Sequence, residues 1–227
     1  MTDVSRGIRR IARIDLEAFA TNVAGASVLD VRADAYGHSI ALVGPVAREA
    51  GVSSLVVSDE ADAAAARAVG FTDLHIGRLL RDVGALGAKA YGLDDAGTPV
   101  LTLVGEVISI KHVGADAGVS YGYTYRTEAP TCLALIALGY ADGVPRLASN
   151  RASVRVGSDV HPLVGRIAMD QFVVDCGDDV PAPGSEAMLF GDPGTGATST
   201  HDWATGTERH PLQLTAGLGA RVTRIAR

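Results

Sequence analysis

The pattern of apolar residues changes once, near residues 92–99, and this change limits the fold more than any other feature of the chain. Before it, short apolar runs alternate with alanine-rich amphipathic stretches, which predicts strands over residues 8–14, 28–33, 53–58 and 74–77, each followed by a helix, over 16–26, 40–50, 61–69 and 79–90. A closed eight-fold βα barrel takes about 250 residues. Fewer than one hundred precede the change, so a closed barrel is excluded.

After the change, the chain has the character of a β domain. Strands are predicted over residues 100–112, 131–138, 153–156, 163–175, 186–190 and 222–226, with a short helix over 212–218. We therefore expect an α+β protein. Residues 1–95 form a truncated α/β part, a partial TIM-barrel-like remnant of about three βα units, and residues 96–227 form a mainly-β domain, which strand 8–14 can join. The sequence leaves open how residues 78–99 bridge the missing part of the barrel.

Local signals support the first part of this assignment. Asp15 and Asp59 stand where a carboxylate can accept hydrogen bonds from the free amides of a first helical turn. The first three parallel strands each alternate one apolar and one polar face, and the polar faces include Asp30, Arg32, Ser54 and His75. A two-layer fragment with one polar sheet face is expected.

Composition excludes several classes of function. The chain has 20 Lys+Arg against 26 Asp+Glu, a net charge of −6, so no nucleic-acid partner is expected. The longest uninterrupted apolar run, residues 132–138, is far shorter than the roughly 20 residues that span a bilayer, so no membrane segment is expected and the chain is predicted to be cytoplasmic. Only Cys132 and Cys176 occur, and no metal site is predicted.

Six segments resemble, in the same order, the motifs of the alanine racemase family. They are RIDLE at 13–17, VRADAYGH at 31–38, VSYG at 119–122, GYADGVPR at 139–146, VGRIAMDQ at 164–171 and GARVTR at 219–224. The resemblance implies a bacterial pyridoxal-phosphate isomerase that interconverts L- and D-alanine for peptidoglycan, built from a barrel and a C-terminal β domain and active as a head-to-tail dimer. In the family a lysine forms a Schiff base with the cofactor, and a tyrosine from the partner subunit serves the opposite face of the substrate.

The resemblance transfers these roles to individual residues. Tyr140 matches the catalytic tyrosine, Tyr36 a cofactor-side tyrosine, and Met169 and Asp170 lie in the loop that meets the substrate carboxylate. The Schiff-base lysine position, however, holds Arg32, which is predicted to be non-functional there. A guanidinium stays protonated, its nitrogens are delocalised, and it cannot form an imine.

Other family positions also differ. Leu212 stands where the resemblance implies a phosphate-binding tyrosine, which leaves Tyr36 as a vestige. The chain has two lysines, Lys89 and Lys111, and both are interpreted as solvated side chains. No cofactor and no racemase turnover are therefore expected.

Asp30 adds a possible compensation for Arg32. It lies two residues earlier, hence on the same face of the predicted strand, and we hypothesise an ion pair that can include Asp34. At an exposed site such a pair contributes only about 0–1 kcal/mol.

The expected function is that of a binding or scaffold protein. Unpaired edges of the short parallel sheet favour a homodimer, and a heteromer with a full-length racemase is a further expected partnership. Tyr121, Tyr123 and Tyr125 are predicted to share one strand face, where aromatic side chains suit an interface. Two alternatives stay open: an active alanine racemase that uses another lysine, and a small-ligand site on the polar sheet face.

Overall fold

The computed structural model describes residues 7–77, 84–94 and 96–227 and divides into two compact units. Unit 1 comprises Met1–Ile11, Thr102–His210 and Leu218–Thr223, and unit 2 comprises Ala12–Leu101, Pro211–Gly217 and Arg224–Arg227. Both units therefore take segments from distant parts of the sequence. The domain boundary at residues 95 and 96 stays a prediction.

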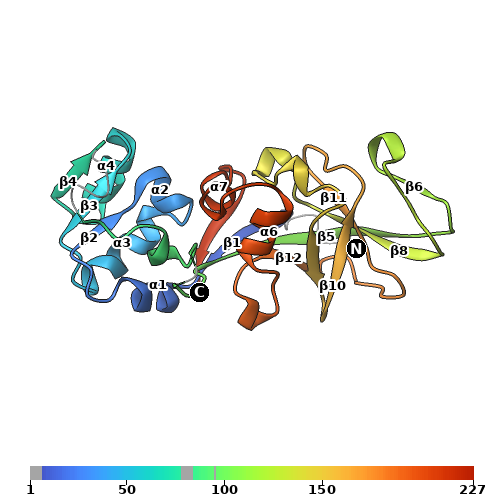
Figure 1. Cartoon of the computed structure of the whole chain (residues 1–227), viewed down its shortest axis with the longest axis horizontal. Helices are drawn as coiled ribbons and strands as arrows, with labels where there is room; N and C mark the ends of the chain where they lie inside the picture. The colour runs from blue at the N-terminus through green and yellow to red at the C-terminus, as the bar shows by residue number, and fades with distance from the viewer. Residues whose placement is uncertain (1–6, 78–83, 95) are drawn as a thin grey trace. The chain divides into compact units, whose positions relative to one another are not determined.

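Unit 2 contains a parallel three-stranded sheet in the order β2-β3-β4 (Figure 1). Its strands are β2 (Val28–Asp30), β3 (Ser54–Val57) and β4 (Asp73–Ile76), and its helices include α1 (Leu16–Val23), α3 (Ile40–Glu49) and α4 (Glu60–Ala68). Helix α3 contacts both α1 and α4. The core gathers large apolar side chains that are fully buried, among them Phe19, Leu29, Ile40, Leu55 and Tyr91.

The two predicted helix caps in unit 2 are confirmed. The Asp15 side chain accepts from the Ala18 N–H at the start of α1, and the Asp59 side chain accepts from the Ala61 and Asp62 N–H groups in the first turn of α4. The free edge of β2 is also occupied: Leu86 N–H donates to Val28 O, and Asp30 N–H donates to Leu86 O, each at 2.9 Å. Part of the predicted helix 79–90 lies outside the described residues, and its last residues form the short η1 (Ala88–Tyr91).

Unit 1 is built around a six-stranded antiparallel barrel-like sheet. Its strands are β5 (Leu101–Val113), β8 (Thr131–Ile136), β9 (Ser153–Val156), β10 (Asp159–Val164), β11 (Phe172–Asp175) and β12 (Glu186–Phe190). In the order β12-β9-β10-β11-β8-β5, strand β12 also pairs with β5, which closes the circuit. β1 (Arg10–Ile14) and β13 (Thr223–Ala226) follow β5 in the sheet order. The interior includes Leu103, Ile136, Phe172, Phe190 and Trp203.

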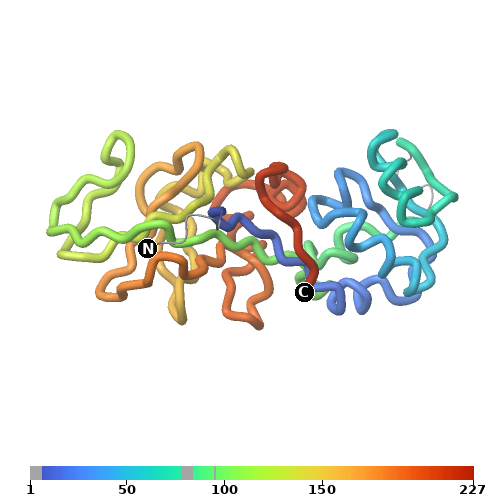
Figure 2. Tube along the Cα trace, turned by 180° about the vertical axis from the view of Figure 1, so that it is seen from behind, coloured from blue at the N-terminus to red at the C-terminus, as the bar shows by residue number. Residues whose placement is uncertain are grey.

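Several predicted elements of unit 1 differ from the structure. The strand predicted over 163–175 is two strands, because the chain turns at Gly165, which has φ +73°, and enters the loop that holds Met169. Helix α6 (Thr200–Gly206) was not predicted. The tyrosines of the segment 121–125 do not share a strand face: η2 (Tyr121–Tyr123) lies between β6 (Gly118–Val119) and β7 (Tyr125–Arg126). Figure 2 traces this excursion between β5 and β8.

The remaining short elements complete the chain. They are α2 (Arg32–Tyr36), η3 (Tyr140–Asp142), η4 (Arg146–Ala148), η5 (Pro193–Thr195) and α7 (Pro211–Ala216). Within the described ranges, no helix combines the length and the apolar character that crossing a membrane requires.

Candidate functional site

Arg32 lies just after β2, in unit 2, and not on the strand face where it was predicted. Strand β2 ends at Asp30 because Ala33, Asp34, Ala35 and Tyr36 all adopt left-handed conformations, with φ between 51° and 56°. A left-handed conformation brings Cβ close to the following carbonyl oxygen, so four such residues in a row need stabilising contacts from other parts of the chain.

Two carboxylates supply these contacts. Asp62, almost fully buried, accepts from the backbone N–H groups of Ala33 at 3.1 Å and Asp34 at 3.0 Å. The Asp34 side chain accepts from Ile40 N–H at 2.7 Å, at the start of α3. The first turn of α3 thus receives an anionic acceptor, which also favours the helix dipole. Asp34 is therefore not part of the ion pair that was hypothesised for it.

The hypothesised pair between Asp30 and Arg32 is present. Arg32 Nε and Nη2 donate to the two carboxylate oxygens of Asp30, each at 2.9 Å, and the Arg32 backbone N–H donates to the same carboxylate at 3.1 Å. Asp30 is fully buried, whereas the Arg32 side chain is 35% exposed. The site is not the exposed one assumed from the sequence, because the buried carboxylate needs its partner.

Tyr36 completes this cluster. Its hydroxyl donates to Asp30, and Arg32 Nη2 donates to the Tyr36 oxygen at 3.2 Å. The hydrogen bond to Asp30 raises the pKa of Arg32 further above its usual range. Burial, with the hydrogen bond to Asp30, raises the pKa of Tyr36 to about 12. Arg32 is thus a fixed cation, and the residues here do not fit a cofactor held through an imine at this position.

His38 is fully buried next to this turn. Its Nδ1 faces the carbonyl oxygens of Ala35 and Tyr36, and its ring packs on Tyr91 with centroids 4.7 Å apart. The imidazole is fully buried, and burial lowers the pKa of His38 to about 4. The Tyr91 hydroxyl donates to Asp30 O at 2.6 Å. The rings of His38 and Tyr91 therefore both contact the backbone of the segment 30–36.

The polar sheet face predicted for unit 2 is interrupted. The strand register aligns Asp30 with Val56 and Val56 with His75, so a buried valine lies between the two polar residues. Ser54 is also buried, at 3% exposure. Because the Asp30 carboxylate already serves Arg32 and Tyr36, this face does not bring together a free acid, a base and a hydroxyl.

Tyr140 and Met169 lie in unit 1, on two loops that are joined through their backbones. Tyr140 N–H donates to Ala168 O and Ala141 N–H donates to Met169 O, each at 3.0 Å. Gly139 is required at this junction, because a Cβ there would meet the Met169 carbonyl oxygen at 2.3 Å. The side chains of Tyr140 and Met169 remain 47% and 51% exposed. The structure therefore places these two predicted residues together.

A buried carboxylate fixes the loop that holds Tyr140. Asp142 is fully buried and accepts from Gly139 N–H at 2.8 Å. It also forms ion pairs with Arg10 at 3.4 Å and Arg221 at 3.0 Å. Arg221 reaches Asp170 of the second loop at 2.6 Å, and this hydrogen bond raises the pKa of Arg221. One guanidinium thus connects both loops.

Sequence reasoning missed these supporting residues. Asp142 and Arg221 occur within the GYADGVPR and GARVTR segments, but nothing in either segment indicates that they pair across 79 positions of the chain. Arg146 was missed as well: its guanidinium carbon lies 5.8 Å from the centre of the Tyr140 ring. The spacing of six residues within the same segment is the one available signal for that contact.

Comparisons with known proteins match the second half of the chain most directly. Residues 100–226 match the family model "Alanine racemase, C-terminal domain". Alanine racemase from Thermobifida fusca is 44% identical over 135 residues, which cover 59% of this chain and 36% of that protein. The chain thus spans little more than a third of the length of this relative.

Solved structures give the same fold. The crystal structure of alanine racemase from Streptomyces lavendulae superposes with a TM-score of 0.87 at 23% identity, over 98% of this chain and 98% of that chain. The α+β fold with its β domain is therefore that of an alanine racemase. The description of unit 2 as a truncated TIM barrel stays a prediction.

One comparison corrects the expectation of no cofactor. Alanine racemase from Bartonella henselae, with covalently bound pyridoxal phosphate, superposes with a TM-score of 0.81 at 20% identity over 96% of this chain and 99% of that chain. The expectation that a chain of this kind has no cofactor is wrong, because the Bartonella henselae protein, which has the same fold, binds pyridoxal phosphate covalently. The guanidinium of Arg32 excludes only a cofactor that is bound through an imine to residue 32.

The family model covers more than half of the chain, and its limits enclose the segments that hold Tyr140, Met169 and Arg221. This chain belongs to the alanine racemase family.

Proposed function

We propose that this chain acts as a binding or scaffold protein of the alanine racemase family, which presents Tyr140 and Met169 to a full-length alanine racemase and has no racemase turnover of its own. The carrying observation is that both side chains are exposed on backbone-locked loops, while Arg32 is paired with its own chain. In unit 1, Tyr140 and Met169 are accessible to a partner, whereas in unit 2 the Arg32 cation is paired with Asp30.

The lack of turnover follows from the chemistry of residue 32. A guanidinium cannot condense with an aldehyde, and both oxygens of Asp30 hold it in a forked hydrogen bond. Lys89 and Lys111 are both exposed, outside this cluster. The family's base on this side of the substrate is therefore absent from the described residues.

Presentation to a partner follows from the state of the other two side chains. Because the loops that hold Tyr140 and Met169 are already fixed, little backbone entropy is lost when these side chains bind a partner. Arg146 beside Tyr140, and Tyr121 and Tyr123 at 66% exposure each, supply the residue types that are enriched in protein interfaces. A homodimer is the proposed state of the chain when the full-length partner is absent.

The test is complementation between two inactive proteins. The partner is Thermobifida fusca alanine racemase in which the tyrosine matching Tyr140 is replaced by phenylalanine. Mixing it with this chain is expected to give a complex in light scattering and to restore alanine racemisation. The Tyr140→Phe variant of this chain should form the same complex without restoring activity, and Met169→Ala should restore less.

Three results would count against the proposal. Absence of a complex at micromolar concentrations removes the partner. A complex without restored activity leaves binding but removes the role of Tyr140. Racemisation by this chain alone removes the claim that it lacks turnover and supports the active-enzyme alternative.

A further inference from the structure

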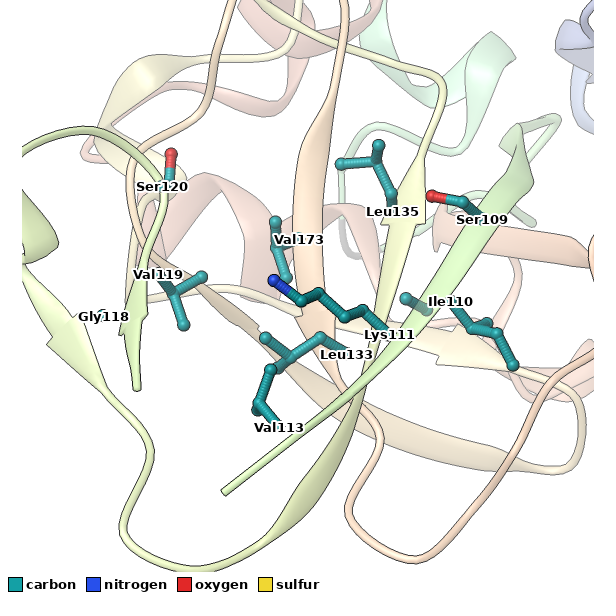
Figure 3. A pocket seen from close by; sticks show the side chains of 11 residues that line it. Ser109, Ile110, Lys111, Val113, Gly118, Val119, Ser120, Leu133, Leu135 and Val173 are labelled. Carbon is teal, nitrogen blue, oxygen red and sulfur yellow. The ribbon is translucent and has the colours of Figure 1, made fainter. Parts of the chain in front are cut away.

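A pocket of about 250 Å³ lies in unit 1 over the outer face of strands β5, β8 and β11 (Figure 3). Its walls come from β5 on one side and from Gly118, Val119 and Ser120 of the β6 segment on the other. The lining is mostly aliphatic: Val113, Val119, Leu133, Leu135 and Val173. Tyr140 and Met169 are not among the residues that line it.

Lys111 is the one charged residue among those that line this pocket. In Figure 3 its side chain crosses the aliphatic floor, and its amino group points into the space between Val119 and Val173. Within the described ranges, Lys111 forms no ion pair or hydrogen bond from its side chain. An exposed ammonium group beside aliphatic surface, with no anion of its own, can pair with an anionic ligand, while its carbon stem adds to the apolar floor.

The nearest acid in the same row of the sheet is already engaged. The register aligns Lys111 with Leu133, and Leu133 with Asp175, so Asp175 lies two strands away, or about 10 Å at the usual strand spacing. Its carboxylate accepts from Tyr125 Oη at 2.8 Å, from Thr131 Oγ1 and from Gly177 N–H at 3.1 Å. Both oxygens of the Asp175 carboxylate thus already accept hydrogen bonds.

The polar atoms of the pocket are otherwise few. The Ser120 hydroxyl donates to Arg166 O at 2.6 Å and is committed to the loop. Ser109 supplies one further hydroxyl in the lining. One cation and one or two hydroxyls at the edge of an aliphatic floor match a molecule with a single anionic end and an apolar body.

We propose that this pocket binds a small monocarboxylate with an apolar body, its carboxylate on Lys111 and its hydrocarbon part over Leu133, Leu135 and Val173. The size agrees with a small ligand, because the pocket is below the range of about 300–1,000 Å³ that is usual for drug-sized molecules. A neutral apolar occupant would cover the ammonium without pairing it, and a dianion would leave one charge on the aliphatic floor. The proposal does not depend on the proposed function.

The chain itself offers a selective measurement. Because it contains only two lysines, reductive methylation with ¹³C labels Lys89, Lys111 and the terminal amine, and methylation keeps the charge. The probe is 4-phenylbutyrate, and its matched neutral control is 4-phenylbutanamide. Titration with 4-phenylbutyrate is expected to move the Lys111 signal with a submillimolar Kd and to leave the Lys89 signal in place. The amide should bind at least tenfold more weakly.

Two variants separate the charge from the fold. Lys111→Gln should weaken binding of the acid at least tenfold, measured by calorimetry, without changing the weak binding of the amide. Lys111→Arg should retain binding, since it keeps the cation. Lys111 is exposed on its strand, so neither change removes core packing.

The opposite results are equally definite. Equal affinity for the acid and the amide, equal movement of Lys89 and Lys111, or unchanged affinity in Lys111→Gln would each overturn the proposal. No binding at millimolar concentrations would do the same. If a second copy of the chain covers this face, sedimentation will show a dimer that excludes the acid, and the ligand assignment is then wrong.

Discussion

His38 is expected to make the stability of unit 2 depend on pH. Its Nδ1 lies 2.9 Å from Ala35 O and 3.1 Å from Tyr36 O, so the proton of the neutral ring is assigned to Nδ1. Its Nε2 is buried and has no hydrogen-bond partner in the part of the chain that the structure describes. A second proton would therefore create a buried cation with an unpaired N–H, next to the positive charge of Arg224.

The sign follows from the direction of the shift. Burial lowers the pKa of His38 from 6.5 to about 4 in the folded state, so the unfolded chain binds the proton first as the pH falls. This contribution to stability is complete above pH 6.5 and is lost as the pH falls toward 4. Between about pH 7 and about pH 4.5 the linkage relation gives a loss of about 2.5 kcal/mol in the free energy of unfolding.

Urea unfolding of the wild type and of His38→Gln at these two pH values isolates the effect. Carboxylates titrate in the same range, but they do so in both proteins, so the comparison cancels them. The wild type should lose about 2.5 kcal/mol more than the variant on acidification. If the two proteins lose the same free energy within about 0.5 kcal/mol, burial does not keep this imidazole neutral, and the reasoning is refuted.

Two further stability predictions use matched pairs of positions. Asp142→Asn should lower the free energy of unfolding in urea by about 2–4 kcal/mol, because it neutralises a fully buried acceptor of two ion pairs. Asp170→Asn should lower it by less than about 1 kcal/mol, because the Asp170 side chain is 43% exposed. Equal losses would show that burial does not decide the strength of these pairs. Gly37→Ala should lower the free energy of unfolding by about 3 kcal/mol or more, because Gly37 has φ +82° and a Cβ would lie 2.1 Å from Thr215 O. Gly157→Ala should lower it by only about 1 kcal/mol, because Gly157 has φ +67° but open space around it. Thermal or urea unfolding of all four variants checks both pairs, and a similar cost for the two glycines would contradict the close approach at residue 37.

Local signals in the sequence were sufficient where the structure is held locally. Asp15 and Asp59 were identified as caps because a capping carboxylate acts within three residues of its own position. Helix α6 had a similar signal that was missed: Ser199 accepts from Asp202 N–H and donates to the Asp202 side chain, a spacing visible in the sequence.

Other features depend on contacts between distant residues and could not be predicted. In the segment from Ala33 to Tyr36 only Asp34 is a residue type that tolerates a positive φ, and Asp62, almost thirty positions later, accepts from two of the segment's amides. The strand predicted over 28–33 was therefore too long. The pairing of Asp142 with Arg221 is equally non-local, so the sequence identified Tyr140 but not the ion pairs that fix its loop.

Asp30 links the replacement at residue 32 to the proposed function. A fully buried carboxylate without a cation would be strongly destabilising, so Asp30 and Arg32 are stable together and neither is free to change alone. The pair also fixes Tyr36, so the turn keeps its shape while its charged groups are satisfied internally. The side chains of Tyr140 and Met169 are about half exposed, and backbone hydrogen bonds join the loops that hold them. A chain that supplies Tyr140 to a partner without racemising alanine itself is expected to have both features: exposed side chains on fixed loops, and a charged cluster at residue 32 that is already paired.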